Sequence, residues 1–324
     1  MTASIQRILC PIDLGRTAPS VLRCAASIAT TFGATLEAVH VRTSGERAQW
    51  TPFQSRTELV ESVMASHATE QRLSQVVEGA RAKVHVRTKV LDGATAATII
   101  AEAERAEADL LVIGAAARSA WWQRRSTACD LSSQARCAVL TVPVDVPAMF
   151  ARRILLPVDF SVATDVALDW TILLARTFGS HVDVLHALPP ESKGSHAGAS
   201  SLKRPRLAVA LKRLAATIAR LREAGVSDTT SVVVEGDTLD AILARNQSES
   251  SDLIVMGNHA VTQQVRNPDA TPGTIAWVRA SLAVPVLSVR GAPVSAESQW
   301  QDLRRGGGAL RKPDVAEGPL ALSN

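Results

Sequence analysis

The 324-residue chain contains no tyrosine, and aromatic residues make up only 3% of it. Proteins that bind single-stranded nucleic acid generally stack the bases on exposed aromatic rings. The net charge of +4 is small for this length, and the basic residues are scattered along the chain. The composition therefore argues against a nucleic-acid-binding protein.

Long apolar runs are also absent from the sequence. No segment approaches the roughly 20 apolar residues of a membrane-spanning helix, and the N-terminal stretch lacks the apolar core of a signal peptide. The four cysteines show neither metal-ligand spacing nor the density of a disulfide scaffold. We therefore expect a cytoplasmic protein with reduced thiols, without a metal site and without membrane contact.

What the sequence does contain is an internal repeat. The stretch RILCPID begins at Arg7 and RILLPVD begins at Arg153, so the two lie 146 residues apart (153 − 7). The stretch DLLVIG at Asp109 matches DLIVMG at Asp252 at an offset of 143 (252 − 109). Matches that keep their order, with small changes in spacing, indicate a duplicated domain.

Each copy alternates short apolar runs with helical segments, an order typical of a parallel sheet covered on both faces. The third apolar run predicts a strand over residues 84–90 in the first copy and 231–235 in the second. The hydrophobic content of 46% is ample for full cores. We predict two five-stranded α/β domains, residues 1–146 and 147–292, followed by a disordered polar tail over residues 293–324.

The last apolar run of each copy, CAVLTVPVDV or VPVLSVRGAPV, would leave an aggregation-prone edge if it stayed unpaired. Two such edges in one chain can cover each other. We therefore predict an intrachain pseudo-dimer with approximate two-fold symmetry.

A ligand of an open parallel sheet binds beyond the carboxyl ends of its strands. Asp13 and Asp159 follow the first predicted strand of each copy, and Gly114 and Gly257 end the fourth. The loop after each glycine leads into a helix N-terminus, whose free N–H groups favour an anion. These positions are the candidate binding sites, although the same carboxylates could instead cap the helix that follows.

In the order of these segments, and in the PID/PVD and DLLVIG/DLIVMG motifs, the chain resembles the tandem form of the universal stress protein family. The resemblance covers about residues 5–143 and 152–290. It implies Rossmann-like domains of the adenine-nucleotide alpha-hydrolase type and a role in the stress response. It also implies ATP or another adenine nucleotide as cofactor, held by a loop of the form G-x2-G-x9-G-[ST] and by the carboxylate after the first strand.

The second copy keeps only part of that loop. Gly257 begins it, but Ala260 stands at the second glycine, and Gly273-Thr274 follow after twelve residues instead of nine. An alanine tolerates positive φ poorly, so the loop differs in shape from the family pattern.

The first copy departs further from the pattern. Ala117 replaces its second glycine, and Ser126-Thr127 end the loop without a preceding glycine. Trp121 and Trp122 lie between them, either as a plug for the pocket or as an exposed contact patch.

The resemblance assigns candidate nucleotide-binding residues to both copies. In the second copy they are Pro157, Val158, Asp159, Ala187, Gly257, His259, Ala260, Gly273 and Thr274. A less complete set in the first copy consists of Asp13, Val41, Gly114, Ser126 and Thr127.

Two functions remain open at this point. One is a regulatory stress-response module with degenerate nucleotide pockets, acting as a sensor or through a protein partner or further dimerisation. The other is an ATP-binding stress protein that uses the second-copy pocket, with slow ATP hydrolysis as an extension. No nucleophile with a general base and an orienting group can be assembled from the sequence, and it has no Walker A lysine. We therefore expect a binding protein rather than an enzyme.

Overall fold

The computed structural model describes residues 5–43, 56–80, 83–115, 127–144, 146, 151–188, 199–258 and 274–291. All of them belong to one unit, Met1–Gly291. The predicted tail at residues 293–324 lies outside the described residues, so its disorder stays a prediction.

Both halves of the chain fold in the same order of elements. The first half runs β1 (Arg7–Pro11), α1 (Ala18–Phe32), β2 (Thr35–Arg42), α2 (Arg56–Gly79), β3 (Val86–Asp92), α3 (Thr95–Arg105), β4 (Leu110–Gly114), α4 (Thr127–Gln134) and β5 (Ala138–Val142). The second runs β6 (Arg153–Pro157), α5 (Val162–Phe178), β7 (His181–Leu188), α6 (Ala199–Glu223), β8 (Thr229–Glu235), α7 (Thr238–Glu249), β9 (Leu253–Asn258), α8 (Thr274–Ser281) and β10 (Val286–Arg290). The duplication read from the sequence is therefore present in the fold.

Local sequence explains where the first helix of each half ends. Gly33 and Gly179 close α1 and α5 in the left-handed conformation, with φ of 65° and 64°. A side chain would be strained there, so glycine is the residue of choice at this cap.

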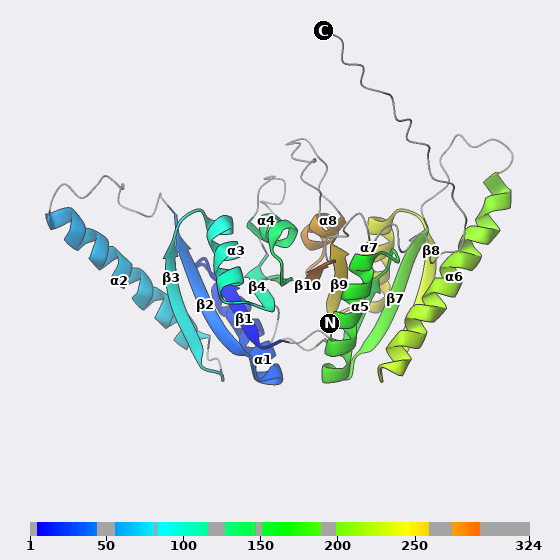
Figure 1. Cartoon of the computed structure of the whole chain (residues 1–324), viewed down its shortest axis with the longest axis horizontal. Coiled ribbons are helices and arrows are strands. Elements are labelled where there is room, and N and C mark those ends of the chain that lie inside the picture. Colours follow the sequence, from blue (N-terminus) through cyan, green and yellow to red (C-terminus); the bar gives the residue numbers. More distant parts are fainter. Residues whose placement is uncertain are drawn as a thin grey trace, which may run out of the picture. The chain divides into compact units, whose positions relative to one another are not determined.

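The strands form one sheet in the order β3-β2-β1-β4-β5-β10-β9-β6-β7-β8 (Figure 1). Within each half the paired strands are parallel, whereas β5 and β10 pair antiparallel. The prediction of two five-stranded parallel layers joined through their last strands is confirmed. The predicted boundary between residues 146 and 147 falls between β5 and β6 and stays a prediction.

Equivalent residues of the two halves meet at the seam. Leu140 pairs with Leu287 in the β5–β10 ladder, and the two are related by the repeat (287 − 140 = 147). Phe32 and Phe178, which the repeat also relates, make an edge contact with ring centroids 6.3 Å apart. These contacts give the two halves approximate two-fold symmetry.

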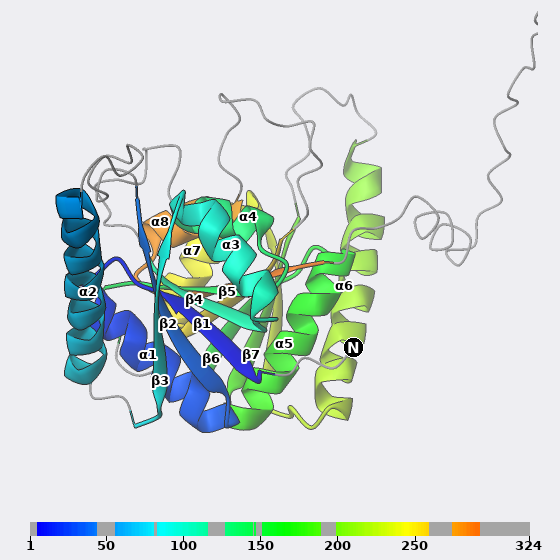
Figure 2. The same cartoon turned by 60° about the vertical axis from the view of Figure 1, so that its left-hand side comes forward.

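The hydrophobic core differs between the two faces of the sheet. On the face covered by α1, α2, α5 and α6, a single cluster of buried side chains runs through both halves. On the other face, α3 and α4 cover one cluster in the first half, and α7 and α8 cover a separate cluster in the second (Figure 2). The first face therefore joins the two halves more extensively than the second.

None of the helices in the described part of the chain is both long enough and apolar enough to cross a membrane.

Candidate functional site

The candidate residues lie at the carboxyl edge of each half. β1 pairs with β4, and β6 pairs with β9, in parallel. The residues that follow β1 and β6 therefore lie at the same edge as the ends of β4 and β9. This arrangement brings Asp13 to the edge that carries Gly114, and Asp159 to the edge that carries Gly257, as the sequence predicts.

In the second half, Asp159 binds the start of its own helix. Its Oδ1 accepts hydrogen bonds from the Ser161 N–H at 3.0 Å and from the Thr164 hydroxyl at 2.6 Å. The Ser161 hydroxyl in turn accepts from the Thr164 N–H at 3.3 Å, so it caps α5. The helix cap is therefore Ser161, and Asp159 supports it by holding the Ser161 N–H and the Thr164 hydroxyl.

Gly257 lies against the same helix start. A Cβ placed on it would be 2.5 Å from the carbonyl carbon of Ala163, 2.6 Å from that residue's oxygen and 2.8 Å from the Thr164 nitrogen. Real side chains do not approach backbone this closely, so glycine here permits α5 to pack on the end of β9.

The equivalent positions of the first half are less crowded. Asp13 Oδ1 accepts from the Gly15 N–H at 2.8 Å, and the N-cap residue of α1, Thr17, makes no side-chain capping bond. A Cβ on Gly114 would meet only side-chain atoms, Val21 Cγ2 at 3.3 Å and Thr17 Oγ1 at 3.6 Å. The same motif therefore builds two different environments.

A histidine joins the first two strands in each half. His40 Nδ1 lies 2.7 Å from the carbonyl oxygen of Ile12, and His186 Nδ1 lies 2.7 Å from that of Val158. Because a carbonyl only accepts, each Nδ1 carries the hydrogen and donates it. The repeated histidine is a structural link at the strand ends.

In the second half, an aromatic group lies over that histidine. The ring of Phe160 lies 4.5 Å from the His186 ring, and the guanidinium of Arg213 lies 5.5 Å from the Phe160 centroid. Phe160 holds a positive φ of 62°, which places its ring there at some backbone strain.

The other candidate residues divide into buried ones and helix starts. Val41, Val158 and Ala187 are buried in the core, so their side chains pack against protein. Thr127 and Thr274 lie in α4 and α8, at the first residue of each helix that the structure describes. Ser126, His259, Ala260 and Gly273, together with Trp121 and Trp122, lie outside the described residues.

An ion pair that sequence reasoning missed lies beside the first-half site. Arg42, directly after Val41, donates from Nε and Nη2 to both carboxylate oxygens of Asp92 at 2.9 Å and from Nη1 to the Ser66 hydroxyl at 2.6 Å. It ties together β2, β3 and α2. Leu188 stands at the equivalent position (188 − 42 = 146), so the second half lacks this clamp.

The aspartate that opens the DLLVIG and DLIVMG motifs acts at the opposite edge. Asp252 Oδ2 accepts the N–H groups of Arg152 and Arg153 at 3.0 and 2.9 Å. Asp109 Oδ2 accepts those of Gln6 and Arg7 at 2.8 and 2.9 Å. The motif aspartate therefore holds the start of the first strand of each half.

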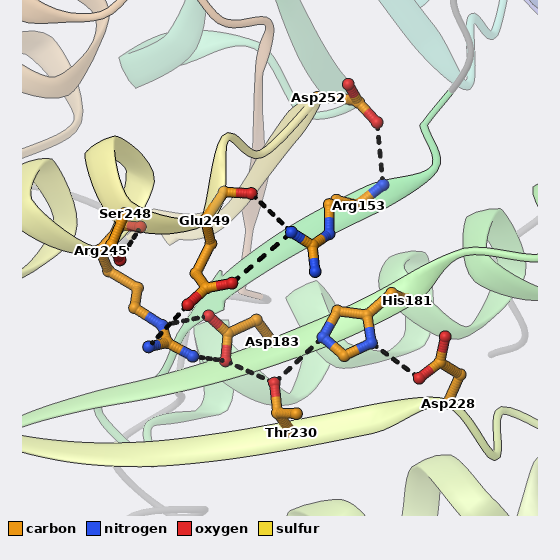
Figure 3. A network of polar contacts seen from close by, with 9 residues as sticks. All are labelled: Arg153, His181, Asp183, Asp228, Thr230, Arg245, Ser248, Glu249 and Asp252. Atoms are coloured by element: carbon orange, nitrogen blue, oxygen red, sulfur yellow. Dashed lines mark hydrogen bonds and ion pairs between the residues drawn. The ribbon is translucent and has the colours of Figure 1, made fainter.

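Figure 3 shows a larger polar network at this amino edge of the second half. His181 Nδ1 lies 2.8 Å from Asp228 Oδ1, and its Nε2 lies 3.1 Å from the Thr230 hydroxyl. That hydroxyl donates to Asp183 at 2.8 Å, and Asp183, 4% exposed, also binds Arg245. The hydrogen bond from Arg245 to Asp183 raises the pKa of this guanidinium above its ordinary value.

An acid, an imidazole and a hydroxyl in series have the order of a nucleophilic triad. Here, however, the Thr230 hydroxyl gives its proton to Asp183, so His181 is not placed to remove it. The network instead fastens β7, β8 and α7 to one another. Sequence reasoning missed it because the partners in these hydrogen bonds are 47 or more residues apart along the chain.

Two further features of the described part of the chain are its potential metal ligands and the burial of its cysteines. They contain no group of three or more His, Cys, Asp or Glu side chains that could hold a metal ion. Cys10 and Cys24 are fully buried in the core. Burial raises the pKa of both thiols, that of Cys24 to about 12.

Comparison with known proteins agrees with this architecture. The chain is similar to the solved structure of a universal stress protein from Archaeoglobus fulgidus DSM 4304, with 16% sequence identity, a TM-score of 0.63, and coverage of 90% of this chain and 100% of that one. It is also similar to a putative universal stress protein from Pseudomonas aeruginosa UCBPP-PA14, with 19% identity, a TM-score of 0.60, and coverage of 93% of this chain and 98% of that one. A third similar structure is that of a protein of Pseudomonas aeruginosa PAO1 described as functionally unknown, with 19% identity, a TM-score of 0.61, and coverage of 94% of this chain and 99% of that one. At these identities the likeness shows the fold alone.

A search of curated proteins finds no significant match. The model of the universal stress protein family, by contrast, matches the chain twice, over residues 4–143 and 151–266. Because the two matches cover well over half of the sequence and one falls on each half of the fold, the chain belongs to the universal stress protein family, in a tandem two-domain form.

Proposed function

We propose that this tandem universal stress protein is a regulatory module of the stress response that acts by binding, through a protein partner or a further copy of itself, and not by catalysis. Its two domains are residues 1–146 and 147–292. Its nucleotide pockets are degenerate.

The observation that carries the proposal is the position of α5. Its first turn lies against Gly257 at distances that leave no space for a Cβ, and its Thr164 hydroxyl binds the Asp159 carboxylate. A nucleotide at this edge would have to compete with the start of α5 for the Asp159 carboxylate. The alanines at positions 117 and 260 support the same conclusion from the sequence.

The alternative is an adenine-nucleotide-binding protein that uses the second copy, with slow hydrolysis as its extension. It is supported by Gly273-Thr274, which keeps the end of the family loop and leads directly into α8. The free N–H groups at that helix start favour a phosphate.

Isothermal titration of the full chain with ATP–Mg²⁺ distinguishes the two functions. We expect no binding heat at millimolar nucleotide. Heat that disappears in Thr274→Ala but persists in the matched first-copy variant Thr127→Ala would refute the proposal in favour of the second-copy pocket. Phosphate release that is lost in Thr274→Ala alone would add hydrolysis to that alternative.

A further inference from the structure

β8 is the outer strand of the second half of the sheet (Figure 1). Among the described residues it pairs only with β7. The side chains of Thr230 and Ser231 are exposed. An outer strand with accessible backbone groups can accept another strand.

The ladder fixes which backbone groups of β8 point outward. Val182 donates its N–H to the Asp228 carbonyl at 3.0 Å, and Gly236 donates its own to the Leu188 carbonyl at 2.9 Å. Backbone groups alternate in direction along a strand. Even-numbered residues therefore face β7, and the odd-numbered ones, Ser231 at their centre, face away from it.

The two outer strands of the sheet differ in charge. β3 carries Arg87 and Lys89, and Lys89 pairs with Glu102. The run Thr229–Val234 of β8 has no charged residue, proline or glycine. Charges on an outer strand obstruct pairing with another chain, so β3 is protected in a way that β8 is not.

The helix above β8 continues this uncharged edge. α6 packs on the sheet through buried residues such as Leu214. Four exposed apolar residues follow one another along the helix at intervals of four: Leu207, Leu211, Ala215 and Ala219. Leu207 is 38% exposed and Leu211 is 52% exposed. Residues four apart share one helix face, so they form an apolar stripe along α6.

Two arginines of α6 show which way that stripe points, whereas a third, the exposed Arg222, follows the stripe on its own face. Arg213 lies over Phe160, and Arg220 binds Asp165 and Asp169 of α5. At 100° per residue, these arginines stand about half a turn from the stripe. The arginines face α5, so the stripe faces the opposite way, past β8.

The equivalent helix of the first half, α2, also exposes Met64 and Ala68, but the part of it whose side chains are described continues with charged residues. Exposed positions over the described part of α2 include Glu70, Gln71, Arg72 and Glu78. The first half thus provides a comparison surface within the same molecule, with charges on both its outer strand and its outer helix.

We propose that β8 and the stripe of α6 together form a docking surface for a second copy of this chain. β8 pairs antiparallel with its counterpart, and the two stripes pack against each other. The chain already joins its own halves by antiparallel pairing of equivalent outer strands, β5 and β10. The alanines of the stripe permit two helices to approach closely, with their i±4 ridges interlocking.

Self-pairing at this edge brings no like charges together. With the two-fold axis at Ser231, Thr229 lies opposite Val233 and Asp228 lies opposite Val234 of the other copy. β-branched residues opposite one another stabilise an antiparallel pair. A second copy therefore fits the uncharged run Thr229–Val234 of the strand.

Sedimentation equilibrium of the full chain tests the proposal. At about 50 μM, we expect the wild type to have twice the 34.3 kDa mass of one chain. Ala215→Glu, which places a charge at the centre of the stripe, should weaken dimerisation at least tenfold. Ala68→Glu, at an exposed position of α2, should leave it unchanged.

A second pair of variants tests the strand. Ser231→Pro removes an outward N–H of β8, and Thr88→Pro does the same at the repeat-related position of β3 (231 − 88 = 143). Only Ser231→Pro should produce monomers. Circular dichroism and the thermal midpoint of both variants check that each of them folds. A monomeric wild type, or equal effects of the two members of either pair, would overturn the proposal. So would a dimer that survives either Ala215→Glu or Ser231→Pro.

Discussion

At the scale of single residues, the duplication supplies pairs of equivalent positions in different surroundings. Gly114 and Gly257 end equivalent strands, yet only at Gly257 would an added Cβ lie within 3 Å of helix backbone. A helix backbone cannot yield as a side chain can, so the two glycines have different structural importance.

Replacing each glycine by alanine should show this difference. Gly257→Ala forces α5 away from β9 and should cost about 1–3 kcal/mol or more, in the range of overpacked sites. Gly114→Ala meets only side chains that can change rotamer, and should cost below about 1.5 kcal/mol. Urea unfolding of both variants measures the difference, and equal losses would contradict the packing assigned to Gly257.

The motif aspartate at the amino edge gives a second prediction. Asp252→Ala leaves two backbone N–H groups of Arg152 and Arg153 without their acceptor. Hydrogen bonds to a charged group contribute about 1.5–3 kcal/mol each, so the free energy of unfolding should fall by about 2–4 kcal/mol. Asp228→Ala, at a side chain that is 73% exposed, is the control and should change it by less than about 1 kcal/mol. Equal stability of Asp252→Ala and the wild type would show that the clamp is dispensable.

The roles of the site carboxylates could be predicted only in part. The pattern PID/PVD correctly placed Asp13 and Asp159 beyond the first strand, but it could not decide between ligand and cap. The two halves differ five residues on, where the first has Ala18 in place of Thr164 (164 − 146 = 18). That hydroxyl binds Asp159, and its significance becomes visible only when the helix start is folded back on the strand end.

At the scale of elements, the alternation of apolar runs and helical segments predicted every strand and helix type, but not all strand limits. The third strand was expected at 84–90 and 231–235, whereas β3 is Val86–Asp92 and β8 is Thr229–Glu235. Outer strands are half exposed, so hydrophobicity marks their limits poorly. Pairing with β2 and β7 sets those limits instead.

A buried carboxylate connects two of these elements. Glu102 on α3 is 5% exposed and accepts from Lys89 of β3 at 2.8 Å and from Arg105 Nε at 3.0 Å. The hydrogen bonds from Arg105, and then from Lys89, lower the pKa of Glu102 below its ordinary value. The group therefore stabilises the fold above the pKa of an unfolded glutamate, about 4.3, and this contribution is lost as the pH falls through the folded pKa.

Glu102→Gln should make the protein less sensitive to acid. At pH 7 the variant should be less stable, because Lys89 and Arg105 lose their charged partner. Below about pH 4.3, where the wild type loses this contribution, the two stabilities should converge. Urea unfolding between pH 7 and pH 3 measures both, and a constant difference across that range would exclude Glu102 as a source of acid sensitivity.

At the scale of the whole molecule, the pairing of the halves was predictable because each copy carries an apolar last strand that needs cover. The asymmetry of the seam was not. Three donors of the second half bind carbonyl oxygens of α4 in the first: Asn258 to Ser132, Arg279 to Ala128 and Arg290 to Gln134. Desolvation lowers the pKa of Arg279 to about 10. The repeat-related positions of the first half are Ala115, Ser132 and Pro143. Their side chains are too short to donate equivalent hydrogen bonds to the second half.

The continuous core on the other face leads to a prediction about cooperativity. Because one cluster of buried side chains runs through both halves, we expect a single unfolding transition. Phe32 and Phe178 meet across the pseudo-two-fold axis, so they should be energetically coupled although 146 residues separate them (178 − 32).

A double-mutant cycle with Phe32→Leu and Phe178→Leu measures that coupling. An aromatic pair in edge contact contributes about 0.5–1.5 kcal/mol beyond the area it buries. Either single variant loses this term, so the double variant should be less destabilised than the sum of the singles by about that amount. Additive losses, within about 0.3–0.5 kcal/mol, would mean that the two helix ends touch without stabilising each other. Two separate transitions in the wild type would mean that each half unfolds alone, and that the β5–β10 seam, not the shared core, holds the halves together.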